Sequence, residues 1–549
     1  MSTTRIFTRR EVEARIAAGD TLIISDNYIL RLNAWQEVHP GGRLVVQHMV
    51  GRDASDELRI FRIGRIEGVW ENFIPPIQGG HFRAASDIDD EDASTVGSGS
   101  ESDIGSSASS EKRSRASSRS SVDSFPVHKE MPLKRNPKLD VKKAPQAMKG
   151  WKVEAVPGSY AEQAIQEAIA ADIAIYPSLD AETQRNITLK FRALHQRILK
   201  EGYYDCHYSE YAKEMVRYTA LFALFLYTLH REWYFASAVA LGCFWQQIMF
   251  TGHDAGHRGI THNFVIDSLI GIFVGNFCCG LSIGWWKSSH NVHHFVTNDP
   301  VHDPDTQNTP MFTISPAFFT SIKSSYYGGF QFMWDAAGDF AVKYQKYTYY
   351  PILAIARFNL YYLSWWHLMS PRSIKRGTAA WVRPTEALAI MCYCYLFFYL
   401  LLWKTIPTWS DRMTFLFVSH LATLPLQVQI TLSHWGTSTS DLGPTEAFAQ
   451  RQLRTTMDVA CPKWLDFIHG GLQFQAVHHL FPRMPRHNLR KAQGMVKEFC
   501  AETGIKYQIL GFVDGNYHVL GKLQHIADQA KLLAACSKHM AEAGVSDFH

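Results

Sequence analysis

The stretches HDAGH (253–257), HNVHH (290–294) and QAVHH (475–479) decide how this sequence folds. In a helix, residues three or four positions apart share one face, so each stretch can direct two or three side chains at one point. One HxxxH pair alone is common on ordinary helix faces, whereas three such stretches beside long apolar runs favour a shared site. We therefore expect distant parts of the chain to meet at these histidines.

The number and chemistry of these side chains indicate a centre with two metals. Seven histidines and Gln475 are too many ligands for one metal ion and suit two. Neutral imidazole suits iron, and a nitrogen-rich site with open positions suits the binding and activation of oxygen. His434, just after an apolar run, is a further candidate ligand, with a satisfied interfacial histidine as the alternative. Asp254 and Asn291 are candidates for orienting the ligands, or else solvated helix residues.

Long apolar runs after residue 215 indicate a membrane domain, with buried helices of a large soluble protein as the alternative. The first two runs and the last two are separated by short polar gaps, so we expect each pair to form a membrane hairpin. The two middle runs carry polar residues and are expected at the interface, which leaves all three histidine stretches on one side of the bilayer. The runs are 216–229, 233–250, 264–286, 347–366, 386–403 and 413–432.

Charge and cysteine content argue against two other classes of protein. The 55 basic and 51 acidic residues nearly cancel, and no dense basic face interleaved with aromatics appears, so we expect no nucleic-acid partner. The nine cysteines are odd in number and lie mostly in apolar stretches, so a disulfide framework is not expected.

The composition divides the chain into three parts. Residues 1–83 have the alternating apolar pattern of a small folded domain and contain HPGG at 39–42. Residues 84–144 are rich in serine and charge and cannot bury enough apolar area to fold, so we expect a disordered tether. Residues 145–549 contain the apolar runs and the three histidine stretches.

At these residues the chain resembles the membrane fatty-acyl desaturases, and the glutamine of QAVHH resembles the front-end subgroup of that family. HPGG resembles the cytochrome b5-like domain that is fused to members of this subgroup. Three stretches are most similar to fungal delta-8 sphingolipid desaturases: PPIQGG (75–80), LSHWGTSTSD (432–441) and HGGLQFQAVHHLFPRMPRHNLRK (469–491).

The resemblance implies a multidomain fold: a small α+β cytochrome b5-like domain and an all-α membrane domain of about four membrane helices in two hairpins, with interfacial helices and a cytosolic cap. It also implies an enzyme of the endoplasmic reticulum membrane, with its N-terminal domain and active site in the cytosol. The reaction would use O2 to place a delta-8 double bond in the long-chain base of a ceramide-type lipid. Implied metal ligands are His253, His257, His290, His293, His294, Gln475, His478 and His479.

The implied cofactors are two non-haem irons and haem b, with NADH-cytochrome b5 reductase as the electron donor and a membrane lipid as the substrate. Two related activities stay open: a front-end fatty-acid desaturase acting on acyl-CoA or phospholipid, and a lipid hydroxylase. A catalytically inactive membrane adaptor is an alternative of another class.

The sequence departs from the family at the haem site. The family clamps haem between two histidines, and His39 of HPGG matches the first. The second should follow the DASDEL-like helix (53–58), but no histidine occurs there before His81, which we expect in a glycine-rich loop. Either a segment is missing, or His48 or His81 substitutes, or the domain binds haem poorly. We favour the missing segment.

Overall fold

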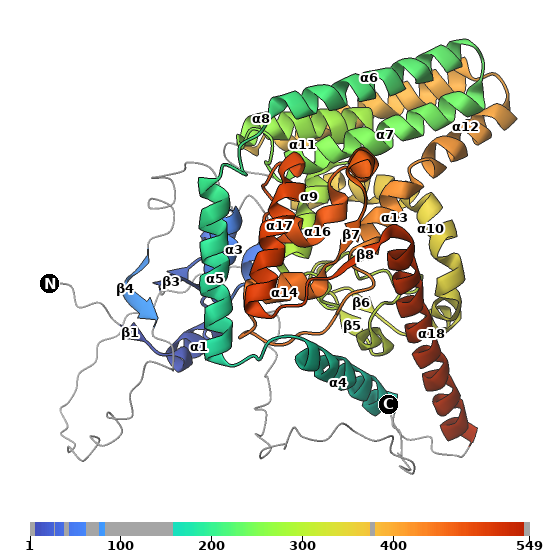
Figure 1. The fold of residues 1–549 in the computed structure, drawn as a ribbon. Helices are drawn as coiled ribbons and strands as arrows, with labels where there is room; N and C mark the ends of the chain where they lie inside the picture. Colours follow the sequence, from blue (N-terminus) through green and yellow to red (C-terminus); the bar gives the residue numbers. More distant parts are fainter. Residues whose placement is uncertain are drawn as a thin grey trace, which may run out of the picture.

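The computed structural model describes residues 6–26, 28–37, 43–61, 76–82, 157–373 and 379–542. The predicted tether at 84–144 and the predicted haem ligand His39 lie outside the described residues. Figure 1 shows three parts: an N-terminal module of strands and short helices, long helical hairpins at the top, and a helical cap from which the hairpins project.

The N-terminal module contains a four-stranded sheet in the order β1-β4-β3-β2, in which β2 and β3 are antiparallel and β1 and β4 are parallel. Phe7, Val12, Leu22 and Ile29 form a small buried core. This arrangement agrees with the expected small α+β fold, while its identity as a cytochrome b5-like domain stays a prediction. The elements are β1 (Ile6–Phe7), α1 (Arg9–Ala17), β2 (Leu22–Ser25), β3 (Tyr28–Arg31), η1 (Trp35–Glu37), α2 (Arg43–Gln47), α3 (Ser55–Phe61) and β4 (Pro76–Phe82).

The two helices of the last predicted hairpin are present, and their crossing of a membrane stays a prediction. Within the described residues, two helices are long and apolar enough to cross a membrane, Val382–Thr405 and Trp409–Leu432. The first consists of α11 (Val382–Cys394) and the π-helical η8 (Tyr395–Thr405). The second consists of α12 (Trp409–Leu421) and α13 (Leu424–Leu432), and Pro425 in the first turn of α13 favours the start of a new helix.

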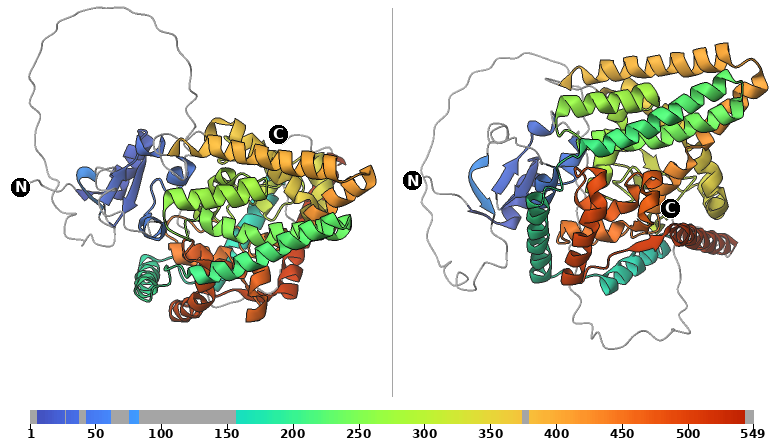
Figure 2. Two further views of the ribbon diagram at one scale, coloured as in Figure 1. Left: turned by 90° about the horizontal axis from the view of Figure 1, so that it is seen from above. Right: turned by 45° about the horizontal axis from the view of Figure 1, so that its top comes forward.

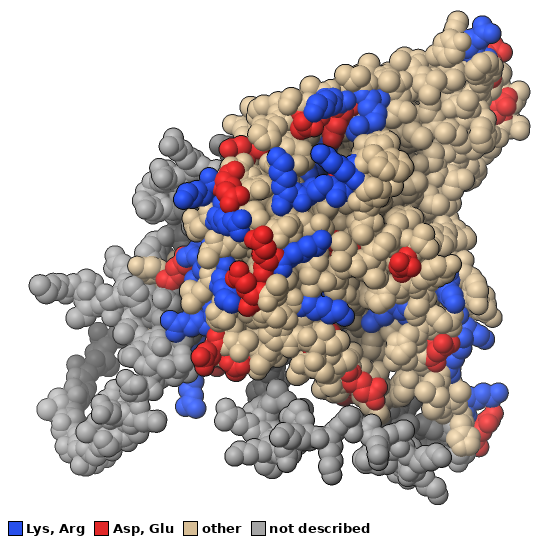
Figure 3. All heavy atoms as spheres, viewed as in Figure 1, with Lys and Arg blue, Asp and Glu red and all other residues tan. Residues whose placement is uncertain are grey.

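The first predicted hairpin forms, but its two helices fall short of the same test of length and apolarity. Helices α6 (Tyr208–His230) and α7 (Tyr234–Gly256) lie side by side, and α7 also packs against α12. The first half of α6 is charged, and Gln246 and Gln247 interrupt the apolar run of α7. Membrane crossing by these two helices therefore stays a prediction. In Figure 3 the surface that projects with them is mostly uncharged between a charged tip and a charged base.

The run at 264–286 is broken by a sharp turn. Helix α8 (Phe264–Gly271) continues as the π-helical η4 (Ile272–Cys278), and α9 (Ile283–Phe295) then departs at 114°. Gly280 at the turn has φ of 71°, a conformation that glycine adopts without a Cβ clash. The buried carboxylate of Glu386 accepts hydrogen bonds from Asn276 and Ser282 on the two sides of the break. The break directs α9, which carries HNVHH, toward the cap.

The run at 347–366 lies within α10 (Ala336–Met369). Its buried Arg357 donates to the Cys279 carbonyl (2.7 Å) and lies over the Trp245 ring (4.3 Å). This contact joins α10 to α7 and to the turn before α9.

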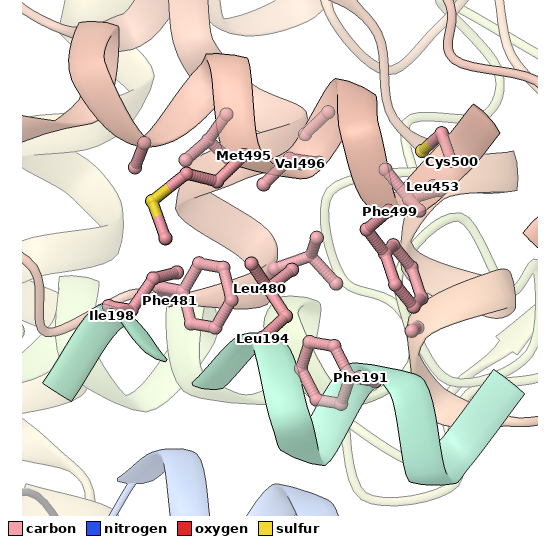
Figure 4. Close-up of a cluster of buried hydrophobic side chains, with 14 of the residues drawn as sticks. Phe191, Leu194, Ile198, Leu453, Leu480, Phe481, Met495, Val496, Phe499 and Cys500 are labelled. Carbon is pink, nitrogen blue, oxygen red and sulfur yellow. The ribbon is translucent and has the colours of Figure 1, made fainter. Parts of the chain in front are cut away.

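The cap holds the third histidine stretch on the short helix α16 (Gln475–Leu480). Helices α5 (Ala181–Lys200) and α17 (Arg486–Thr503) cover α16 with the apolar side chains seen in Figure 4, such as Phe191, Leu480 and Val496. In both views of Figure 2 the N-terminal module lies at one side of the molecule, next to the remainder of the chain. The remaining elements are α4 (Pro157–Ile175), η5 (Pro316–Phe319), β5 (Ile322–Lys323), β6 (Gln331–Phe332), η6 (Pro371–Ser373), α14 (Phe448–Thr455), β7 (Asp458–Ala460), η9 (Lys463–Leu465), α15 (Asp466–His469), η10 (Leu472–Phe474), β8 (Ile509–Gly511) and α18 (Phe512–Glu542).

Candidate metal centre

The structure brings the three histidine stretches together from three separate helices. The first stretch occupies the last turn of α7, the second the C-terminal half of α9, and the third all but one residue of α16. Because side chains three and four residues apart share one helix face, each helix presents its histidines as a set. The sets meet at the junction of the hairpins and the cap.

Four of these histidines form a first group, which we call the four-histidine group. One ring nitrogen from each lies within 4.8 Å of those of the others, and the members are His253, His257, His290 and His478. The indole of Trp286 forms one wall of the group, with its ring stacked 4.3 Å from that of His290. A tetrad of nitrogens at this spacing is able to hold one metal ion.

Three further histidines form a second group, which we call the three-histidine group. It consists of His293, His434 and His479, whose ring nitrogens also lie within 4.8 Å of one another. His434, which the sequence left undecided, enters the site from the loop after α13. The carboxylates of Asp303 and Asp305 lie on the other side of His293 at similar spacing.

His294 lies between the two groups. Its ring centroid is 4.8 Å from those of His257 and His478 and 4.1 Å from that of His479. The amide oxygen of Gln475 is buried without a hydrogen-bond partner in the described part of the chain. All of the sequence-predicted metal ligands therefore lie in or beside the two groups.

Most histidines of the site are buried in the neutral form, and His293 is the exception: burial lowers its pKa, but the carboxylates of Asp303 and Asp305 outweigh this and raise the pKa to about 9. Burial lowers the pKa of His434, His478 and His479 well below the ordinary histidine value, so these imidazoles are neutral. Among the described residues, the buried Nε2 atoms of His253, His257, His478 and His479 have no hydrogen-bond partner. Buried polar atoms are rarely left unpaired, and neutral imidazole nitrogen is a common metal ligand. The donor set therefore fits metal ions at both groups.

Two hydrogen bonds orient the three-histidine group. His293 donates from Nδ1 to Oδ2 of Asp303 (2.8 Å), and the same carboxylate oxygen accepts from the backbone N–H of Asn298. His479 donates from Nδ1 to the amide oxygen of Gln452 (2.9 Å). Such outer partners select the tautomer that leaves Nε2 for the metal. The sequence analysis did not identify either partner, although Asp303 lies in an acidic stretch soon after HNVHH.

The four-histidine group has a more distant carboxylate. Asp254 Oδ1 lies 3.6 Å from Nδ1 of His253, too far for a good hydrogen bond. Arg486 of α17 holds Asp254 in place through a 2.5 Å contact and also donates to the Phe250 carbonyl. Asp254 therefore lies beside His253, and its role in orienting that ring stays a prediction. For Asn291, which is half-buried, the described residues provide no such contact.

The N-terminal module packs against the helix that carries the second histidine stretch. Helix α2 contacts α9, and Val46 and Met49 share an apolar cluster with Phe295. Two ion pairs flank this contact: Asp56 with Arg192 (2.6 Å), and Glu57 with Arg451 (2.9 Å).

The two histidines considered as substitute haem ligands have different surroundings. His48 is half-buried at the contact of the module with the rest of the chain, and its ring lies 4.6 Å from that of His302. His81, expected in a glycine-rich loop, instead belongs to β4, because its backbone pairs with β1 and β3.

Comparison with known proteins assigns the chain to a family. The family model described as fatty acid desaturase matches residues 232–511. Three relatives carry the name Delta 8-(E)-sphingolipid desaturase. The one from Emericella nidulans is 46% identical, with 99% of this chain and 98% of the relative covered. Those from Kluyveromyces lactis and Candida albicans are 44% and 40% identical, covering 99% and 97% of this chain and 97% and 98% of the relatives. With this match and the histidine site, the chain belongs to the fatty acid desaturase family of oxidoreductases.

Proposed function

We propose that this protein is an oxygen-dependent desaturase that introduces a delta-8 double bond into the long-chain base of a sphingolipid. The observation that carries the proposal is the meeting of the three histidine stretches in two adjacent groups. The substrate class and the position of the double bond rest on the names of the relatives, which align with nearly the whole chain.

Two iron ions are the proposed occupants of the site, one in the four-histidine group and one in the three-histidine group, with His294 and Gln475 as additional ligands. The hydrogens of adjacent methylenes in a lipid chain are not acidic, so acid–base catalysis by side chains cannot remove these hydrogens. Two irons, when bound, supply the oxygen activation that this removal needs.

The chain's own residues prepare the site for this chemistry. Asp303 and Gln452 accept the Nδ1 protons of His293 and His479, which keeps the opposite nitrogens available as ligands. His293, His294 and His479 are each at most 2% exposed, so bulk water is excluded from this part of the centre.

The N-terminal module is the proposed source of electrons, with NADH-cytochrome b5 reductase as its donor. Its contact with α9 supports this role, because it holds the module next to the helix that contributes to both groups. The proposal that the module binds haem b rests on His39 alone, and the second axial ligand stays unidentified. The packing of the His48 ring against that of His302 argues against His48 as that ligand.

The proposed location is the endoplasmic reticulum membrane, with the N-terminal module and the site on the cytosolic face. Two apolar hairpin helices support membrane insertion. If α6 and α7 also cross as a pair, the ends that carry HDAGH and His434 return to the same side, as a shared metal centre requires.

Expression in a yeast that supplies sphingolipid long-chain bases, but lacks this desaturase, tests the proposal. Lipid mass spectrometry is expected to find delta-8 unsaturated bases with the wild-type chain and none with His293→Ala. His230→Ala is the matched control, because His230 is exposed at the C-terminal end of α6 and should keep full activity.

Other products would redirect the assignment. A double bond only in fatty acyl chains would indicate a fatty-acid desaturase, and a hydroxylated base would indicate a hydroxylase. Purified protein without iron and without any lipid product would indicate an inactive adaptor. Full product from His293→Ala would contradict the metal-centred mechanism.

A further inference from the structure

An apolar cleft of about 760 Å³ lies where α7, α10, the α12–α13 break and α18 meet. Cys243, Leu421, Leu424, Val428 and Phe512 are among its lining residues, and no charged residue lines it. The volume lies within the range typical of small-molecule sites, roughly 300–1,000 Å³. No residue of the two histidine groups lines this cleft.

Two polar side chains of the cleft, Tyr350 and Asn516, are paired within the protein, and the hydroxyl of Tyr517 belongs to the exposed rim. The Tyr350 hydroxyl donates to Oδ1 of Asn516 (2.9 Å), and the Asn516 amide nitrogen donates to the Phe512 carbonyl (2.7 Å). A ligand in this space therefore finds apolar surface rather than free hydrogen-bonding groups. This lining favours a hydrocarbon chain over a charged or sugar-bearing head group.

The rim of the cleft is apolar and exposed. Leu421 is 49% exposed, and Val513 and Tyr517, in the first turns of α18, are 63% and 71% exposed. Large exposed apolar groups next to one another usually mark a surface that something apolar covers. Leu421 belongs to the membrane-capable helix Trp409–Leu432, so the rim is continuous with a surface suited to the bilayer. The cleft thus opens toward lipid.

The same helix connects the cleft to the metal centre. Leu424 and Val428 of α13 form one wall of the cleft, and α13 ends at Leu432, two residues before His434. The helical rise puts Val428 and His434 roughly 10 Å apart along the chain direction. A hydrocarbon chain lying against α13 is therefore within about two helical turns of His434 along the helix axis.

We propose that this cleft binds the hydrocarbon chain of a bilayer lipid, which reaches the desaturase site laterally from the membrane between α13 and α18. The identification of that lipid as the substrate rests on the proposed function. The binding of a lipid chain in the cleft does not require that the reaction takes place.

Photolabelling tests occupancy without relying on activity. Microsomes that contain the full chain are incubated with a ceramide that carries a diazirine in its long-chain base and are then irradiated. The labelled positions of the protein are mapped to single residues. Labels are expected within 421–428 or 512–520, and they should disappear with excess unlabelled ceramide. His293→Ala should be labelled equally, so failure of the desaturase proposal would leave this result intact. Labels confined to other residues, or insensitive to competition, would overturn the proposal.

Filling the cleft tests its role in turnover. Leu424→Trp is expected to lower product from the long-chain substrate by roughly tenfold, because added volume competes with the lipid chain. Its iron content should stay at the wild-type level. Phe417→Trp on α12 is the matched control, because Phe417 is 53% exposed and does not line the cleft.

If Leu424→Trp does not accumulate in membranes, Val513→Trp at the exposed rim takes its place with the same expected direction. Equal product from the cleft variant and Phe417→Trp, at equal protein level, would show that the cleft does not carry the substrate.

Discussion

The two histidine groups lie next to each other but are held in different ways. In the three-histidine group, His293 and His479 donate to Asp303 and Gln452 at hydrogen-bond distance. In the four-histidine group, packing against Trp286 orients the rings, and the nearest carboxylate is 3.6 Å from His253. The comparison shows that a histidine side chain can be positioned by a hydrogen bond to its ring or mainly by packing against its neighbours.

This difference predicts unequal sensitivity to changes outside the ligands. When a hydrogen-bonded outer partner is removed, the histidine is no longer held in one tautomer and one ring orientation. Removing a more distant charge changes the tautomer and orientation less. The expected effects on iron retention therefore decrease from the ligands, to Asp303, to Asp254, and then to the contact with the N-terminal module.

Replacing one ligand from each group should have the largest effect. His478→Ala and His479→Ala are neighbours on α16 but belong to different groups, so each is expected to remove about one of the two irons and to abolish product. Metal analysis of purified protein and lipid mass spectrometry measure the two effects. His487→Ala, outside both groups, serves as the control. If either α16 variant retained both irons, the result would contradict the assignment of His478 and His479 to two separate metal sites.

Asp303→Asn should have the next largest effect. It preserves the shape of the side chain but weakens the bond to His293, so iron affinity and product should fall roughly tenfold to a hundredfold. Titration with an iron chelator measures the affinity, and Asp303→Glu should recover part of the loss. A purely structural role for Asp303 would lower the protein level without changing chelator sensitivity.

Asp254→Asn should affect iron retention less and stability more. Arg486 would lose a buried carboxylate partner, and breaking a buried ion pair costs about 3–5 kcal/mol when no other partner remains. Glu214 also pairs with Arg486, so we expect the lower end of that range. Thermal unfolding in detergent and chelator titration, done on one preparation, separate the two effects. An iron loss as large as that of Asp303→Asn would contradict the proposed difference between the groups.

Reversing a charge at the contact with the N-terminal module should leave both groups intact. Arg451→Glu puts two carboxylates together at Glu57, so product should fall roughly tenfold while the iron content stays at two. The double variant Glu57→Arg with Arg451→Glu should restore part of the product, as measured by lipid mass spectrometry. A fall in iron content would mean that this contact supports the metal centre rather than electron delivery.

Several features of the fold followed from local pattern. The apolar length of 386–403 and 413–432 predicted the hairpin that the structure contains. The i, i+3 and i+4 spacing of the histidines predicted that each stretch presents its histidines as a set, as α7, α9 and α16 do. The crossing of α6 and α7 stays a prediction, because Gln246 and Gln247 weaken the local signal.

Other features had no local signal. Gln452 lies on α14, far in sequence from the stretch that it supports, and nothing in its neighbours indicates a partner for His479. Arg486 lies next to the third stretch in sequence but acts on Asp254 at the end of α7. The second haem ligand stays unidentified, because no histidine follows residues 53–58 before His81.

The sequence by itself determined the ligand type, the helical presentation of each histidine set and the apolar hairpin, because helix periodicity and hydropathy act over a few residues. Only the tertiary structure decided how the histidines divide into two groups, that His434 joins one of them, and which carboxylates stand behind them. Those outcomes depend on how segments far apart in the chain pack, and that packing is set by the combined shape of many side chains rather than by any short pattern.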